Sequence, residues 1–395
     1  MLKGKKRHDF VYRMSWILFR RFFARKFNFE YDAIRPEKSP FFVISNHLTN
    51  WDPILIGLSF GRNLYYVATD QIFRMGLKSR ILKFLFSPIP LSKTVQETQT
   101  VISIFRRLKD NCNICIFAEG STSFDGETGE IQPSIAKLIK RAGATLVTYR
   151  FTGSYFTLPR WARFISKGKM EGRLVQIYSP ERISAMSTEE IFEAIKSDIN
   201  VSAYDIQEKN MTVFRGKKRA EYLETVLYCC PKCRQFASLK SHDDTLSCKC
   251  GFKVRFNEYG FFEIPEKTEE PPFKTITAWA KWQKREIETL AGNSGGNTPI
   301  FTDGNQRLFK VDSADHDTFI AEGRLCLYKD RLSLTSSNGK EFVFPLAEII
   351  DMSCFAMMRI LFSFKERKIW EIHSKHPRSA LKYIDFFNEV NKHKE

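Results

Sequence analysis

A histidine and an aspartate stand five positions apart, directly after an apolar run. Residues 46–53 read Asn-His-Leu-Thr-Asn-Trp-Asp-Pro, so the two titratable side chains are His47 and Asp52. A five-residue spacing places side chains about 140° apart on a regular helix, so only a loop can bring this pair together. In a loop, Asp52 could accept a bond from one imidazole nitrogen and leave the other as a general base. The structural alternative is that Asp52 caps a helix with Pro53 as its first residue and that His47 is an ordinary loop histidine.

A second polar segment follows another apolar run. Residues 113–117 are predicted to form a strand, and residues 117–123 read Phe-Ala-Glu-Gly-Ser-Thr-Ser. Open α/β sheets bind ligands at the carboxyl ends of their strands, so both polar segments are expected at one edge. A backbone N–H between Glu119 and Ser121 could donate to an oxyanion or to an acceptor phosphate. The chain shows no serine in a nucleophile-elbow context, which favours direct group transfer over a covalent intermediate.

Five of the nine cysteines lie between residues 229 and 250. Cys230 and Cys233 form one Cys-x2-Cys pair, and Cys248 and Cys250 follow after a gap of fourteen residues. Two such pairs predict a tetrahedral four-cysteine zinc site of the ribbon type, with a structural role. Iron or unligated thiols are the alternatives. Cys229 is a candidate substitute ligand, and His242 is interpreted as a loop residue.

Apolar runs alternate with helical patterns over the first half of the chain, which predicts an α/β layer fold with a central, mostly parallel sheet. The expected strands are 41–45, 64–69, 113–117, 144–151 and 174–178. The expected helices are 53–60, 72–86, 94–110 and 132–142, with a helical stretch near 187–209. We assign residues 35–210 to this first domain.

The second half divides into a small cysteine module and a β-rich domain. The zinc ribbon is assigned to residues 226–264, and residues 265–300 to a linker with a short helix around Trp279 and Trp282. Residues 301–395 form the last domain. Its expected elements are strands 323–328, 331–335, 341–345, 349–356, 360–364 and 368–373, then a helix 378–392. Short antiparallel strands followed by one helix resemble, at the level of pattern, a barrel of the pleckstrin-homology (PH) or GRAM type.

The charge of the chain is strongly basic. It carries 62 Lys and Arg against 45 Asp and Glu, a formal charge of +17, and residues 1–110 alone hold 20 basic and 8 acidic side chains. Such a field attracts nucleic acid or an anionic membrane surface. The 36 phenylalanines favour the membrane, because apolar side chains give a basic surface something to insert. A hydrophobic fraction of 43% excludes a disordered chain.

Residues 1–34 are predicted to associate with a membrane through a basic amphipathic helix at 10–27. The structural alternative is a helix packed on the domain with solvated arginines. A second contact is expected where basic residues stand beside apolar ones, namely Arg74, Lys78, Arg80 and Lys83 beside Ile81, Leu82, Phe84, Leu85 and Phe86. No run reaches the roughly 18–20 apolar residues of a membrane span, and no secretory signal is recognised. We therefore expect a peripheral, monotopic protein on the cytoplasmic face of a membrane.

The two polar segments together resemble the glycerolipid acyltransferases of the lysophosphatidic acid acyltransferase type. The first motif of that family, Asn-His-x4-Asp, is present as Asn46, His47 and Asp52. The second resembles residues 88–93, which end in Lys93, and the fourth resembles the apolar run 146–151. The third, Phe-Pro-Glu-Gly-Thr-Arg-Ser, is matched at Phe117, Glu119, Gly120 and Ser123, but Ala118 replaces Pro and Thr122 replaces Arg. The resemblance covers roughly residues 35–210.

The resemblance implies an O-acyltransferase that moves a fatty acyl group from a thioester of coenzyme A or of an acyl-carrier protein to a lysophospholipid. The default acceptor is 1-acylglycerol-3-phosphate. It assigns His47 as general base and Asp52 as its orienting partner, with no catalytic cofactor. The implied substrate-binding residues are Asn46, Lys93, Glu119, Gly120, Ser121 and Thr122.

The missing arginine at position 122 leaves the acceptor open. A threonine hydroxyl can bond a phosphate oxygen but brings no charge and no bidentate fork. Basic residues elsewhere could compensate, and the candidates are Lys93, Arg150, Arg160 and Arg163. One alternative is therefore an acyltransferase for another lysolipid or a hydroxylated acceptor. An alternative of another class is a non-enzymatic protein whose zinc ribbon binds nucleic acid or lipid.

Overall fold

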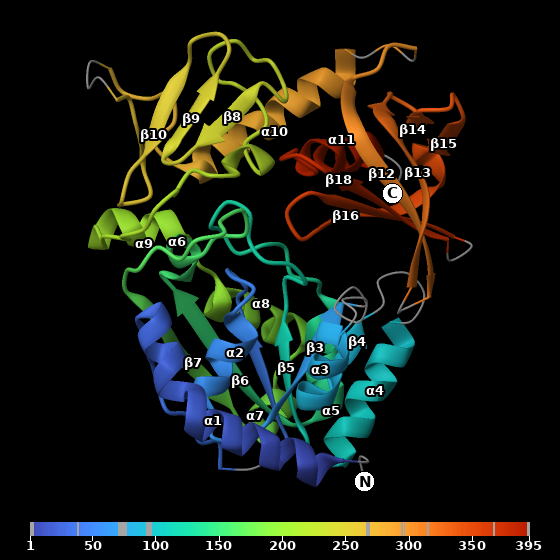
Figure 1. Ribbon diagram of the computed structural model, residues 1–395. Coiled ribbons are helices and arrows are strands. Elements are labelled where there is room, and N and C mark those ends of the chain that lie inside the picture. Colours follow the sequence, from blue (N-terminus) through green and yellow to red (C-terminus); the bar gives the residue numbers. More distant parts are fainter. Residues whose placement is uncertain are drawn as a thin grey trace. The chain divides into compact units, whose positions relative to one another are not determined.

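A computed structural model describes residues 4–37, 39–69, 77–91, 97–265, 269–293, 295, 297–313, 316–365 and 368–392. The chain forms two compact units (Figure 1). The first contains residues 1–160 and 165–216, and the second contains 161–164 and 217–395.

The first unit is built on a seven-stranded sheet with the order β1-β7-β6-β2-β5-β3-β4. The strands are β1 (Phe29–Tyr31), β2 (Phe41–Ser45), β3 (Leu64–Thr69), β4 (Ile89–Leu91), β5 (Asn113–Phe117), β6 (Thr145–Thr152) and β7 (Met170–Tyr178). All neighbouring pairs are parallel except β6 and β7. The predicted α/β fold with a mostly parallel sheet is confirmed.

The middle strands of this sheet were predictable because they are continuous apolar runs. Every residue of β2 and of β5 is buried, as expected for parallel strands covered on both faces. Ser45, the last residue of β2, is paired with Phe117 at the end of β5 and with Tyr149 in β6. This register brings the loop after β2 and the loop after β5 to the same edge.

Helices surround the sheet of the first unit. They are α2 (Asp52–Ser59), α3 (Leu77–Phe86), α4 (Glu97–Lys109), α5 (Ser134–Ala142), α6 (Ser154–Thr157), α7 (Pro180–Ala185), α8 (Thr188–Ile199) and α9 (Ala203–Asn210). The helical stretch expected at 187–209 is divided into α8 and α9. A capping box of Ser187 and Glu190 begins α8, and Ser202 caps α9 by accepting a bond from the Asp205 N–H.

The amino-terminal helix α1 (Lys5–Phe27) begins five residues earlier than predicted. One side of it docks on α2. Tyr12 Oη donates to the carbonyl oxygens of Gly57, at 2.5 Å, and Phe60, at 2.7 Å, and Trp16 Nε1 donates to that of Leu58 at 3.0 Å. These carbonyls belong to the end of α2, where the helix itself supplies no partner.

The second unit begins with a four-stranded antiparallel sheet with the order β11-β10-β9-β8. The strands are β8 (Leu239–His242), β9 (Thr245–Cys248), β10 (Lys253–Phe256) and β11 (Phe262–Glu263), after a 3-10 turn at Leu223–Thr225. Helix α10 (Ile276–Asn293) has 18 residues, whereas the sequence predicted a short helix within a linker. Its Trp279 is 1% exposed, and Trp279 Nε1 donates to the Cys229 carbonyl at 2.9 Å. The helix is therefore part of the core.

The last domain contains seven antiparallel strands in the order β15-β14-β13-β12-β18-β17-β16. They are β12 (Phe301–Ser313), β13 (His316–Leu327), β14 (Arg331–Ser336), β15 (Glu341–Pro345), β16 (Ile349–Phe355), β17 (Arg359–Phe364) and β18 (Ile369–Ser374), with a 3-10 turn at Leu346–Glu348 and a final helix α11 (Leu381–Asn391). The β-rich character is confirmed. The predicted closure into a barrel is wrong, because β15 and β16 are the two edges of an open sheet in the described part of the chain. Strand β12 was not predicted.

Candidate active site and candidate metal centre

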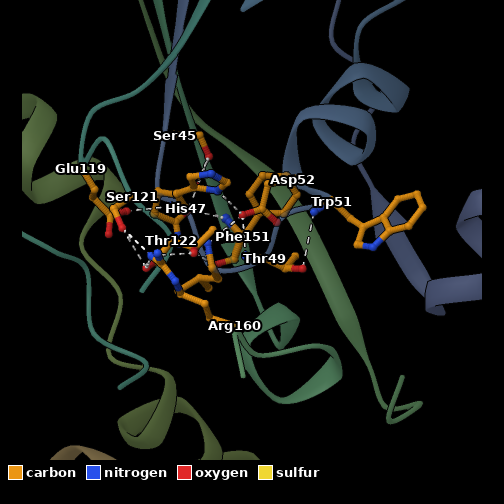
Figure 2. Close-up of polar contacts among 12 residues, drawn as sticks. Ser45, His47, Thr49, Trp51, Asp52, Glu119, Ser121, Thr122, Phe151 and Arg160 are labelled. Carbon is orange, nitrogen blue, oxygen red and sulfur yellow. Dashed lines mark hydrogen bonds and ion pairs between the residues drawn. The ribbon is translucent and has the colours of Figure 1, made fainter. Parts of the chain in front are cut away.

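His47 and Asp52 meet in the loop between β2 and α2 (Figure 2). His47 Nδ1 lies 2.9 Å from Asp52 Oδ2. The same oxygen accepts the backbone N–H groups of Leu48, at 2.7 Å, and Thr49, at 2.9 Å. Asp52 is 0% exposed, so its carboxylate is a fixed acceptor for three N–H groups. With Nδ1 carrying the hydrogen toward Asp52, the lone pair lies on Nε2.

The helix start and the histidine contact are served by the same aspartate. Helix α2 begins at Asp52 itself, with Trp51 preceding it, so Asp52 and Pro53 stand one position further into the helix than predicted. Its carboxylate contacts His47, Leu48 and Thr49 in the preceding loop and makes no capping bond to the helix. The N-cap role that the structural alternative gave to Asp52 is therefore not found.

The imidazole of His47 packs on an aromatic ring and remains partly exposed to solvent. Its ring stacks on Phe117 with centroids 4.3 Å apart, and its side chain is 16% exposed. Among the described residues, the only side-chain hydrogen bond of His47 is the one to Asp52. Nε2 is therefore the nitrogen that an incoming hydroxyl could reach.

Glu119 ties the two loops of the site together. Its Oε1 accepts the His47 N–H at 2.7 Å and its Oε2 accepts the Gly129 N–H at 2.6 Å. The Ser123 N–H donates to the His47 carbonyl at 2.9 Å, so the segment after β5 holds both backbone groups of the histidine. Burial raises the pKa of Glu119 to about 8, against the two backbone N–H groups, which favour the carboxylate. The Glu119 side chain thus contacts the His47 backbone, and its predicted substrate contact stays a prediction.

Gly129 was missed at the sequence level, and Ser123 was noted there only as a motif match and not as a site residue. A Cβ at Gly129 would lie 3.2 Å from Glu119 Oε2, so the glycine allows the carboxylate its close approach. Ser123 Oγ donates to the Glu127 carbonyl at 2.7 Å and accepts the Gly126 N–H at 2.9 Å. The sequence does show a glycine ten residues after Glu119, but residue spacing alone does not predict that a loop of this length closes onto the glutamate.

Asn46, the residue after β2, connects this strand to β6 through its side-chain amide. Its amide donates to the Phe151 carbonyl at 3.0 Å and accepts the Phe151 N–H at 2.8 Å. The side chain is 0% exposed. Both polar atoms of the Asn46 amide therefore contact the Phe151 backbone, and the substrate contact that the resemblance implied stays a prediction.

Arg160 lies against the segment 121–122, as Figure 2 shows. Its Nη1 donates to Ser121 Oγ at 2.6 Å and lies 3.3 Å from Thr122 Oγ1. Gly120, at φ +66°, makes the turn that leads into this segment. Of the other basic candidates, Arg150 donates from Nε to the Asp198 carbonyl at 2.7 Å, near the end of α8.

Two of the predicted basic residues cannot be added to this cluster. Lys93 lies outside the described residues. Arg163 belongs to the second unit, where its guanidinium lies 4.4 Å from the ring centroid of Tyr222. The structure therefore brings together His47, Asp52, Glu119, Gly120, Ser121 and Thr122, and adds Arg160.

The four predicted cysteine ligands converge in the second unit. The sulfur atoms of Cys230, Cys233, Cys248 and Cys250 all lie within 4.8 Å of one another. The Sγ atoms of Cys230 and Cys250 are 3.7 Å apart, and those of Cys233 and Cys248 are 3.8 Å apart. A tetrahedron with Zn–S bonds of about 2.3 Å has edges of about 3.8 Å, so the donor set fits a zinc ion.

The neighbouring candidates stay outside this set. Cys229 is buried, and its Sγ lies 3.5 Å from the Arg234 carbonyl oxygen. His242 ends β8 with a side chain that is 90% exposed and paired with Asp243. His242 was interpreted as a loop residue, whereas the structure makes it the last residue of a strand.

Comparison with known proteins finds similarity to part of the first unit. Residues 26–152 match the family model described as Acyltransferase. Over 128 residues the chain is 26% identical to a probable 1-acyl-sn-glycerol-3-phosphate acyltransferase of Mycoplasma genitalium, which covers 31% of this chain and 47% of that protein. The chain thus spans about half the length of this curated relative. The segment that matches the family model contains both His47 and Asp52 and is similar to the acyltransferase family.

Two solved structures also resemble parts of the chain. One is the 1-acyl-sn-glycerophosphate acyltransferase PlsC of Thermotoga maritima, with 17% identity, 53% of this chain and 83% of that chain covered, and a TM-score of 0.42. The other is the C-terminal domain of an unknown protein of Leishmania infantum, with 13% identity, 28% and 96% covered, and a TM-score of 0.18.

Proposed function

We propose that this protein is a membrane-associated O-acyltransferase that moves a fatty acyl group from an acyl thioester to the hydroxyl of a lysophospholipid. The observation that carries the proposal is the 2.9 Å contact between His47 Nδ1 and the buried Asp52 carboxylate. This contact leaves Nε2 as a base at the carboxyl edge of a parallel sheet. The acyltransferase family match over residues 26–152 supports the same chemistry.

The reaction is a direct transfer. His47 Nε2 takes the proton from the acceptor hydroxyl as that oxygen attacks the acyl carbon, and Asp52 stabilises the imidazolium that forms. The new C–O bond replaces the C–S bond, and the thiolate leaves with the proton that the imidazolium returns. The Gly120 N–H already donates to the Phe117 carbonyl at 3.0 Å. The N–H groups of Glu119 and Ser121 are therefore the candidates for stabilising the oxyanion. The chemistry needs no cofactor.

The acceptor that we favour is 1-acylglycerol-3-phosphate, supported by the name of the Mycoplasma relative. An acyltransferase for another lysolipid or hydroxylated acceptor is the second candidate, because Thr122 stands where the resembling family has arginine. The donor is a thioester of coenzyme A or of an acyl-carrier protein.

An exposed apolar stripe on α1 supports the membrane association. Its side chains are 40% to 65% exposed and follow helical spacing: Phe10, Met14, Ile17, Leu18, Phe19 and Phe22. In α3, which contacts α1, Ile81 and Phe84 are each 50% exposed. Exposed arginines stand beside the stripe at positions 13, 21 and 25. Such a surface suits the interface of an anionic bilayer, with apolar groups inserted and guanidinium groups at the headgroups.

No helix in the described ranges is long and apolar enough to span a bilayer. From the exposed stripe of α1 we propose a peripheral, monotopic association with a membrane, on its cytoplasmic face. The predicted contacts of Arg74 and Lys78 lie outside the described side chains.

The cysteine module is proposed to hold one structural zinc ion through Cys230, Cys233, Cys248 and Cys250. All four thiolates would occupy the tetrahedron, so the ion would stabilise the turn before β8 and the turn after β9 and supply folding free energy there. We keep the pleckstrin-homology or GRAM-like character of residues 301–395 as a proposal that rests on the strand order and the single final helix.

One experiment tests the proposed activity against a binding protein. Purified wild type, His47→Ala and, as a matched control, the exposed His242→Ala are assayed with acyl-coenzyme A, acyl-carrier protein and a panel of lysolipids. We expect His47→Ala to lose about 10²–10⁴ in rate and His242→Ala to keep it. If His47→Ala keeps more than a tenth of the wild-type turnover, the direct-transfer mechanism is wrong. Flotation with anionic vesicles against retention on DNA at physiological salt tests the nucleic-acid alternative.

A further inference from the structure

A guanidinium is held beside the catalytic loop by a segment that is distant in the chain. Arg160 Nη1 lies 2.6 Å from Ser121 Oγ, 3.3 Å from Thr122 Oγ1 and 3.2 Å from the Thr122 carbonyl oxygen. The guanidinium carbon lies 4.1 Å from the ring centroid of Phe124. Contacts with two hydroxyls, a carbonyl and an aromatic face fix both the position and the plane of the guanidinium.

The segment that Arg160 contacts is the one that holds the proposed base. Glu119, two residues before Ser121, accepts the His47 N–H at 2.7 Å, and the Ser123 N–H donates to the His47 carbonyl at 2.9 Å. A positive charge at residues 121–122 is therefore fixed within the same loop assembly as His47, and Figure 2 shows these side chains in one cluster.

We propose that Arg160, with the hydroxyls of Ser121 and Thr122, binds the phosphate monoester of the acceptor. This assignment rests on the proposed function and names the group that selects its substrate. Guanidinium forms short, charge-assisted bonds to phosphate oxygens, and neighbouring hydroxyls complete such a site. The resembling family carries arginine at the position of Thr122, and here the charge reaches the same loop from a residue 38 positions later.

Direct binding tests the site without any acyl transfer. Short-chain, monomeric lysophosphatidic acid, the matching monoacylglycerol and inorganic phosphate are titrated calorimetrically into the full chain. We expect Arg160→Gln to weaken lysophosphatidic acid binding about ten- to hundredfold and to leave monoacylglycerol binding unchanged. Arg160→Lys, which keeps the charge without the fork, should fall between them, and Arg163→Gln, a matched control in the second unit, should bind as wild type.

The three probes distinguish the sources of the phosphate. Binding of lysophosphatidic acid far above inorganic phosphate, lost with Arg160, supports a lipid headgroup site. Equal binding of both probes, lost together, shows a free-phosphate site and overturns the acceptor assignment. Lysophosphatidic acid affinity that stays within twofold in Arg160→Gln, a wild type that does not prefer the phosphate-bearing probe, or equal losses for both lipids also overturn it.

The steady-state assay adds a rescue. Arg160→Gln should raise the KM for lysophosphatidic acid about ten- to hundredfold with little change in kcat, because the phosphate contact is made in ground and transition states alike. Thr122→Arg introduced into Arg160→Gln should lower that KM again. If the rescue fails but Arg160→Gln still loses lysophosphatidic acid binding selectively, the binding measurement supports the phosphate site. If wild type binds as expected but transfers no acyl group, the proposed function fails and the phosphate site remains.

Discussion

Replacing Asp52 by asparagine removes one charge from a fully buried position and changes little else in shape. All three N–H groups around this side chain converge on Oδ2, at 2.7 to 2.9 Å. The asparagine oxygen must occupy that position, since an NH2 group there would face three donors. The tautomer of His47 should therefore survive in Asp52→Asn, and the loss is electrostatic.

The magnitude follows from the geometry. The imidazolium formed in the transition state loses a counter-charge at roughly 4 Å, which is worth about 4 kcal/mol at an effective dielectric constant of about 20. That energy corresponds to a loss of about 10³ in kcat. The new NH2 group would take the place of Oδ1, which is buried and has no hydrogen-bond partner among the described residues. An unsatisfied buried donor should lower the free energy of unfolding by about 1–3 kcal/mol.

Single-turnover acyl transfer and urea unfolding of the same preparations measure both effects. The control is Asp32→Asn, which alters a carboxylate that accepts the Leu174 N–H and pairs with Arg173. It should keep its turnover. A loss below tenfold in Asp52→Asn, with the fold intact, would refute the role of Asp52 as counter-charge to the imidazolium.

Three further predictions concern other parts of the chain. Burial raises the pKa of Glu119 in the folded state to about 8, from an ordinary value of 4.5. Between these two pH values the folded protein holds a proton on Glu119 that the unfolded chain has lost. The free energy of unfolding should therefore fall as the pH rises through this range, by at most about 1.4 kcal/mol per pH unit. Urea unfolding of Glu119→Gln should show a flatter pH dependence, and equal slopes would contradict this. The double change Leu18→Asp and Phe22→Asp should weaken flotation with anionic vesicles about ten- to hundredfold, whereas unchanged flotation would place the membrane contact elsewhere. Metal analysis should find one zinc per wild-type chain, none in Cys230→Ser and one in Cys229→Ser, and a metal-free wild type would exclude the site.

Much of the first unit could be predicted because its strands are buried on both faces. The strands 41–45, 64–69 and 113–117 occur at the predicted bounds. Continuous apolar runs between turn signals are a strong local pattern, because few structures other than a strand covered on both faces bury such a run. Helix α10 was predicted too short because its pattern was assigned to a linker, while its burial depends on distant residues such as Cys229, fifty positions before Trp279.

Strand β12 shows the opposite case. Residues 301–313 contain Asp303, Gly304 and Asn305, which resemble a turn, and the pairing with β13 shifts register between Asp303 and Gln306. Asn305 has φ +55°, so this part of the strand is a bulge that interrupts the alternation of polar and apolar residues. Pairing with β13 on one side and β18 on the other stabilises the strand, and neither partner is visible in the local sequence.

The sequence by itself predicted the contact of His47 with Asp52 and the convergence of Cys230, Cys233, Cys248 and Cys250. These atoms lie on short loops or on paired turns whose spacing limits their geometry. Only the tertiary structure decided what Glu119 and Arg160 do. Glu119 contacts a backbone N–H 72 residues away, and Arg160 contacts hydroxyls 38 and 39 residues away. Such contacts depend on which strand ends lie side by side and on how each loop closes, and these follow from sheet order and packing rather than from the identity of neighbours in the chain.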